Sequence, residues 1–161
     1  FSSAQARITA ELKAGIQTER SQDPVPDGNK LSFGLGYDVG HWSYNVNVSH
    51  INRDDVGNAT VGTELSTDEY LGWVRYHIYK SKDFETYGGL GTGFKIDDAN
   101  IRLYDEKVSE KSEKQWLIGV SAGGNVLFNE TVAANLEVAL LNQPGFKFFE
   151  VAIVVGTSFR F

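Results

Sequence analysis

The most regular hydrophobic pattern of the chain lies in residues 149–161, where large apolar residues alternate with small or polar ones. One face of this segment consists of Phe149, Val151, Ile153, Val155, Thr157, Phe159 and Phe161. The other face consists of Glu150, Ala152, Val154, Gly156, Ser158 and Arg160. A period of two residues predicts a β-strand with one apolar and one small or polar face.

Seven further segments alternate with the same period, and their apolar faces run through residues 8–16, 31–39, 42–48, 70–78, 84–96, 116–126 and 132–140. In the fourth segment the second face mixes Leu71, Trp73, Arg75, His77 and Tyr79, so the pattern leaves its orientation open. In the fifth, inward glycines would make room for large side chains from other strands. Eight amphipathic strands predict an all-β fold, an eight-stranded antiparallel up-and-down transmembrane β-barrel with lipid outside and polar residues inside.

The connections between the predicted strands alternate in length. Long polar connections cover residues 20–29, 52–68 and 97–115, whereas residues 40–41, 80–83 and 129–130 form tight turns. Short periplasmic turns and long external loops are the usual arrangement in outer-membrane barrels, so both termini are predicted to be periplasmic. The last external connection, residues 143–147, is short. Ile101, Leu103 and Val108 extend strands five and six into a predicted protruding hairpin, whose edge can pair with a partner strand.

The length and composition of the chain limit the alternatives. The 161 residues suit one domain, predicted to span residues 7–161, while residues 1–6 are a flexible lead-in or the remnant of a signal peptide ending in Ala4-Gln5-Ala6. No run of about 18 apolar residues is present, so no transmembrane helix is expected. Cysteine is absent, which excludes disulfide and thiolate chemistry. The net charge of −6 argues against nucleic acid as a partner.

Aromatic residues fall near the two ends of the predicted strands. Those predicted near the periplasmic rim are Tyr37, Trp42, Tyr44, Phe84, Phe128, Phe159 and Phe161, and those near the outer rim are Tyr70, Phe94, Trp116, Phe146 and Phe149. Two such belts, separated by aliphatic strand centres, match the two interfaces of a bilayer. The alternative is that aromatic residues simply follow their preference for strands.

The glycine-rich segment 87–94 and the terminal Ser158-Phe159-Arg160-Phe161, together with the eight strands and unequal turns, carry a family resemblance. The chain resembles the small outer-membrane barrels of the OmpX/Ail and OmpA-transmembrane type over residues 7–161. The resemblance implies a location in the outer membrane of a Gram-negative bacterium, in contact with lipid and lipopolysaccharide. It also implies insertion by the outer-membrane assembly machinery, which would recognise Phe159 and Phe161.

Charged residues on the polar faces are predicted to meet inside the barrel. They are Glu11, Lys13, Arg75, His77, Glu85, Lys95, Glu137, Glu150 and Arg160. Apart from His77 they comprise four acids and four bases, which should pair because an unpaired charge in a narrow lumen is costly. We expect Glu11 and Glu137 to pair with Lys13 and Arg75 at mid-depth. Glu85 and Arg160 would pair at the periplasmic end, and Glu150 and Lys95 at the outer end, giving a plugged lumen.

Three functions remain open: a structural or adhesin-like barrel that acts through surface loops, a narrow pore, and an enzyme that modifies lipid A. The one weak catalytic candidate is His50, but Asn52 stands where the known deacylases have serine, and an amide cannot replace a hydroxyl nucleophile. No cofactor is expected. The acidic pairs Asp54-Asp55 and Asp97-Asp98 could hold Ca²⁺ or Mg²⁺ only loosely, and no metal site is predicted. A lipocalin-like barrel would need the apolar and polar faces reversed.

Overall fold

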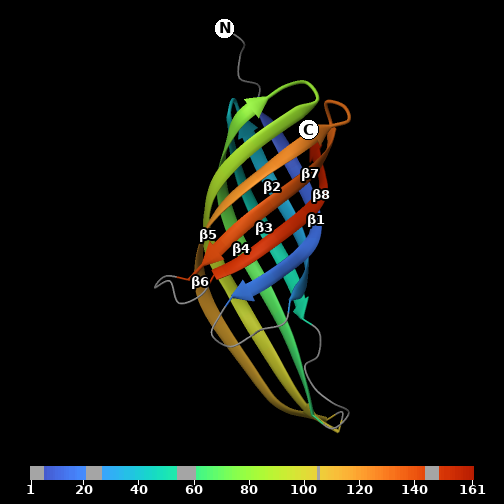
Figure 1. Cartoon of the computed structure of the whole chain (residues 1–161), viewed down its shortest axis with the longest axis vertical. Coiled ribbons are helices and arrows are strands. Elements are labelled where there is room, and N and C mark those ends of the chain that lie inside the picture. Colours follow the sequence, from blue (N-terminus) through green and yellow to red (C-terminus); the bar gives the residue numbers. More distant parts are fainter. Residues whose placement is uncertain (1–5, 21–26, 54–60, 105, 144–148) are drawn as a thin grey trace.

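The computed structural model describes residues 6–20, 27–53, 61–104, 106–143 and 149–161. Most of the predicted lead-in, Asp54-Asp55 and Phe146 lie outside these ranges. The strands are β1 (Arg7–Arg20), β2 (Gly28–Val39), β3 (Trp42–Arg53), β4 (Val61–Lys80), β5 (Phe84–Leu103), β6 (Glu106–Leu127), β7 (Val132–Asn142) and β8 (Phe149–Arg160). Each strand pairs antiparallel with the next and β8 pairs with β1, which closes a barrel (Figure 1). The predicted fold class is confirmed.

The two faces of the strands have opposite chemistry. Outward side chains are apolar and exposed, as shown by Leu35 at 53%, Val46 at 64% and Leu90 at 69%. The buried side chains inside the barrel are mostly polar or charged. An apolar exterior around a polar interior matches a lipid environment, because in water the strands would bury their apolar faces instead. In the described part of the chain, no helix is long and apolar enough to cross a membrane.

The two rims of the barrel differ. At the short-turn rim, residues 40–41, 81–83 and 128–131 connect neighbouring strands, and Gly40 adopts a φ of 60° that suits a tight turn. β1 begins and β8 ends at this rim, where Ile8 and Phe161 exchange backbone hydrogen bonds of 2.9 and 3.3 Å. The opposite end is called the extended rim below.

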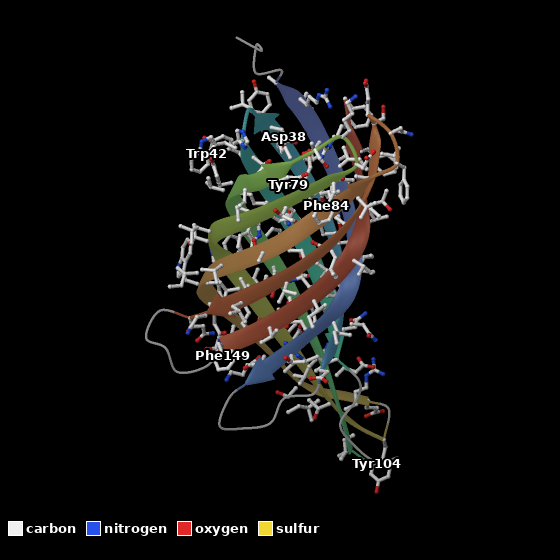
Figure 2. The ribbon with its side chains drawn as sticks, turned by 45° about the horizontal axis from the view of Figure 1, so that its top comes forward. Asp38, Trp42, Tyr79, Phe84, Tyr104 and Phe149 are labelled. Atoms are coloured by element: carbon white, nitrogen blue, oxygen red, sulfur yellow. The ribbon has the colours of Figure 1, made fainter. Side chains whose placement is uncertain are left out.

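Three strands continue well beyond the other five at the extended rim (Figure 1). We call residues 61–69 of β4, 95–103 of β5 and 106–115 of β6 the extension; β3 accompanies β4 as far as Leu65, and Figure 2 shows Tyr104 at the far end. The expected long loops over residues 52–68 and 97–115 are therefore wrong: most of these residues are strand. The hairpin predicted from Ile101 and Leu103 is confirmed, but the contribution of β4 was not predicted. Most outward positions of the extension carry polar or charged residues, such as Asp68, Asp98 and Lys114, so the hydrophobic alternation that marks the rest of the strands is lost.

The fourth predicted segment is part of β4, and the structure shows which of its faces points into the lumen. Leu71, Trp73, Arg75 and His77 are 2–4% exposed and face the lumen. The pairing of β4 with β5 shifts register between His77 and Tyr79, and Tyr79 is 55% exposed. Such an irregularity inserts an extra residue and reverses the side of the next side chain, which is why strict alternation misplaced Tyr79.

Candidate functional site

Four charged side chains meet at mid-depth in the lumen, contributed by β1, β4 and β7. Arg75 donates hydrogen bonds to Glu11 at 3.1 Å and to Glu137 at 2.7 Å. Lys13 Nζ lies 2.7 Å from Glu11 and 2.8 Å from Glu137, and the Tyr87 hydroxyl donates to Glu137 at 2.8 Å. All of these side chains are buried. Two cations therefore balance two carboxylates, as a cluster shielded from water requires.

A second ion pair joins Glu85 and Arg160 near the short-turn rim. Both terminal nitrogens of Arg160 donate to the two carboxylate oxygens of Glu85, one of them at 3.1 Å, which is the strong bidentate arrangement. Asn125 also donates to Glu85, at 3.2 Å. His77 is adjacent: its Nδ1 lies 3.7 Å from Glu85, and its Nε2 lies 2.7 Å from the Ser43 hydroxyl.

A third cluster lies at the extended-rim end of the lumen. Lys95 pairs with Glu150, and Lys30 pairs with Glu69 beside them. The amide of Gln17 donates to Glu69 at 2.5 Å and to Glu150, and its oxygen accepts a hydrogen bond from Lys30 at 2.7 Å. The five side chains are buried and form one connected network.

Several members of the third cluster were absent from the predicted lumen residues. The predicted strands begin at apolar residues, and they therefore omit Lys30 and Glu69, which precede Leu31 and Tyr70. Arg53, whose guanidinium donates to Thr67 at 2.5 Å, was assigned to a loop. The alternation itself carried the missing signal, because Lys30 shares the inward side with Ser32, and Glu69 shares it with Leu71.

An apolar layer lies between the mid-depth and outer clusters. It consists of Leu71, Trp73, Leu117, Ala139, Leu141 and Ala152, all buried inside the barrel. Two small cavities lie in the lumen, one around Arg75 and His77 and one around Lys13 and Trp73, each of about 20 Å³. Each has room for about one water molecule, and the ion-paired cluster at mid-depth lies between them. Side chains thus close the described part of the lumen.

Inward glycines make room for the largest lumen side chains, as the sequence predicted. A Cβ added at Gly91 would lie 2.5 Å from the Trp73 ring, and one at Gly89 would lie 2.9 Å from Cγ of Arg75. Both distances are too short for van der Waals contact. The glycine-rich β5 therefore lets two large side chains of β4 fill the barrel.

The aromatic residues of the predicted belts lie at both ends of the lipid-facing surface. On the extended-rim side, Phe94 stacks on Tyr70 with ring centroids 5.0 Å apart and meets Trp116 edge-on at 5.9 Å. Phe149 is exposed near the start of β8 (Figure 2). Towards the short-turn rim, Tyr37, Trp42, Tyr44, Phe84, Phe128, Phe159 and Phe161 are all exposed. Tyr76, which was not predicted, packs against Trp42 at 5.0 Å.

His50 faces outward on β3, opposite Asp68 of β4 and two residues beyond the Val48–Tyr70 pair, at the outer edge of the aromatic belt. Its Nδ1 lies 2.6 Å from the Asp68 carboxylate of β4, and its Nε2 lies 3.0 Å from the Asn52 side-chain oxygen. The hydrogen bond to Asp68 raises the pKa of His50, because it favours the imidazolium. Among the described residues, no hydroxyl hydrogen bonds to His50. The geometry gives a charge pair and supplies no nucleophile.

The acidic pair Asp97-Asp98 lies on β5, where neighbouring side chains point to opposite faces. Asp97 accepts a hydrogen bond from Thr67 at 2.6 Å and lies 3.3 Å from Lys95. Asp97 is thus engaged by its own neighbours. Within the described residues, no three His, Asp or Glu side chains gather as a metal site.

A closed antiparallel barrel of eight strands, apolar outside and polar inside, is the fold of the small transmembrane β-barrels. No family model matches the chain, and a search of curated proteins found no match. Solved structures of outer-membrane barrels share the fold. Neisserial surface protein A has a TM-score of 0.73 at 12% identity, with 97% of each chain covered. Ail of Yersinia pestis has 0.67 at 11%, with 97% of each chain covered. OprG of Pseudomonas aeruginosa has 0.63 at 16%, covering 99% of this chain and 97% of the other.

Proposed function

We propose that this chain is an integral outer-membrane barrel of a Gram-negative bacterium that acts at the cell surface by binding other proteins through its extension. The apolar exterior and the aromatic residues at both of its ends support a bilayer location. The short turns would face the periplasm, together with the beginning of β1 and the end of β8. The extension would then project from the cell.

The observation that carries this proposal is the long unpaired edge of β6. β7 pairs with β6 only from Ile118 onward, so the described part of the chain has no strand beside Glu106–Leu117 on that side. We call this segment the β6 edge. A row of unpaired backbone N–H and C=O groups is a ready template for an added strand.

The charges of the extension favour a protein partner over an anionic saccharide. The Ail structure contains sucrose octasulfate, a heparin analogue. A similar ligand would need a basic surface, whereas residues 61–69 and 95–117 of this chain carry nine acids and five bases. Backbone pairing has no such requirement, because it relies on hydrogen bonds.

Orientation and exposure of the extension can be tested by cysteine labelling, since the chain has no cysteine of its own. Ser112→Cys on the β6 edge should react with a membrane-impermeant maleimide on intact cells. Lys82→Cys, in a short turn, is the matched control and should react only after the outer membrane is opened. Labelling of Lys82→Cys alone on intact cells would reverse the orientation and remove the basis of the proposal.

A second measurement separates this function from the pore. Because the ion-paired clusters and the apolar layer fill the lumen, the purified barrel should give no steady conductance in a planar bilayer. Folding is verified beforehand by electrophoresis, in which the unheated barrel migrates differently from the boiled one. Regular conductance steps from folded protein would favour the narrow pore.

The exposed aromatic residues Phe159 and Phe161 of β8 have a separate proposed role as the signal read by the assembly machinery. Neither side chain is needed to fill the lumen, since both face outward. Their role would therefore concern insertion into the membrane more than the stability of the finished barrel.

A further inference from the structure

The β6 edge has a regular part that can be defined from the pairing with β5. Ile101 pairs with Ser109, but Arg102 pairs with Lys107, so Val108 has no partner on β5. The ladder is thus regular from Ser109 to Leu117. On the other side of the extension, β3 pairs with β4 up to Leu65, so within the described residues only 61–64 of β4 lack a strand on that side. The β6 edge is the longer of the two.

The charges along this regular part have an unusual order. Glu110, Lys111, Glu113 and Lys114 are arranged around Ser112 so that every acid has a base at the same distance on the other side. Glu110 and Lys114 are two residues from Ser112, and Lys111 and Glu113 are one residue away. When the segment is read in the reverse direction from Ser112, each acid is therefore replaced by a base and each base by an acid.

This order makes the segment complementary to itself when two copies run antiparallel about a two-fold axis at Ser112. Glu110 then lies opposite Lys114 of the second copy, and Lys111 lies opposite Glu113 of the second copy. Each pair occurs twice, and directly opposite residues share a face of the sheet, where opposite charges stabilise pairing. A register centred on either neighbour places Lys111 or Glu113 opposite itself, which is unfavourable. The favoured register pairs Ser109 with Gln115, within the regular ladder.

We propose that the β6 edge binds the β6 edge of a second copy of this chain, antiparallel and centred on Ser112, and thereby joins two membranes. The proposal deepens the surface-interaction function above and rests on it. The extension points away from its barrel, so two antiparallel extensions place their barrels in facing membranes (Figure 1). Two copies in one membrane would present parallel edges. A two-fold axis along parallel strands sets each backbone N–H opposite the same N–H of the second copy, and each C=O opposite the same C=O, so the symmetric parallel arrangement forms no ladder.

The charged side chains of the edge are accessible for such pairing. The side chains of Lys111 and Glu113 are 80% and 56% exposed, and their own contact, at 3.9 Å, is long for an ion pair. Lys114 Nζ lies 4.1 Å from the centroid of the Phe94 ring. Pairing with a second copy would replace the long contact between Lys111 and Glu113 by ion pairs across the two strands, and backbone hydrogen bonds would add to them.

The test uses two double variants that keep the composition and net charge of the full chain. E110K/K111E gives the order Lys-Glu-Ser-Glu-Lys, which places like charges opposite each other in the antiparallel register. K111E/E113K gives Glu-Glu-Ser-Lys-Lys, which keeps every pair opposite in sign and is the matched control. Each protein is reconstituted into neutral phosphatidylcholine vesicles, and clustering between vesicles is followed by light scattering at low and high salt.

Wild type and K111E/E113K should cluster vesicles, and high salt should weaken the clustering because these charges are exposed. E110K/K111E should cluster them at least about tenfold more slowly, since four favourable cross-strand pairs become four repulsive ones. Equal clustering by both variants, or none by wild type, would overturn the self-pairing. The proposed surface function would survive that result if Ser112→Cys is labelled on intact cells and the barrel does not conduct.

Discussion

Replacing Arg75 with alanine should lower the free energy of unfolding by about 3–5 kcal/mol, the usual cost of breaking a buried ion pair from one side. Arg75 is 2% exposed and hydrogen bonds to both Glu11 and Glu137. Without it, Lys13 alone would face two buried carboxylates. The cavity left by the lost side chain adds to the destabilisation. The measurement is a urea titration in detergent micelles, followed by the mobility of the folded band.

Arg102→Ala is the matched control for this variant. Arg102 pairs with Glu64 at 2.9 Å on the extension, where both side chains are more than two-fifths exposed. Exposed ion pairs contribute about 0–1 kcal/mol, so this variant should unfold close to wild type. Similar unfolding curves for Arg75→Ala and Arg102→Ala would show that the mid-depth cluster does not stabilise the barrel.

The transmembrane part of the fold was predictable because lipid imposes a strict rule on every strand. Each outward residue must be apolar, so a period of two marks the strands, their number and their inward faces. The same rule gives depth, because residues can be counted from the short turns. Glu11 and Glu137 could therefore be grouped with Lys13 and Arg75 although they come from different parts of the chain.

The extension could not be found in the same way. Beyond the aromatic belt the outward residues of β4, β5 and β6 are no longer apolar, and a segment containing Asp68, Asp98 or Lys114 has the polar composition of a loop. Their strand structure follows from pairing with neighbours, which is a property of the fold and is not visible in one segment. Gln17 illustrates the same limit within the lumen, since its contacts with Glu69 and Glu150 bridge distant strands.

The second large expected effect concerns Gly93 of β5, where the backbones of β5 and β4 approach each other closely. Gly93→Ala should lower the free energy of unfolding by about 3 kcal/mol, at the upper end of the usual cost of overpacking. A Cβ at this position would lie 1.9 Å from the backbone oxygen of Tyr70 and 2.9 Å from the Cα of Leu71. The obstacle is the backbone of the paired strand β4, so no side-chain rotation can relieve it.

Gly72→Ala provides the matched control, on β4 beside the same ladder. Gly72 faces lipid, and its added Cβ would meet only the backbone oxygen of Thr92, at an ordinary 3.8 Å. Alanine is favoured over glycine within a strand by roughly 0.5–1 kcal/mol, so this variant should be equal to wild type or slightly more stable. A lower free energy of unfolding for Gly93→Ala, with an unchanged or higher one for Gly72→Ala in the same urea series, would show that the backbones of β4 and β5 are in close contact at this depth. If Gly93→Ala unfolds like Gly72→Ala, the two strands are farther apart than the structure places them, and the layer of Leu71 and Trp73 beside them is less tightly packed.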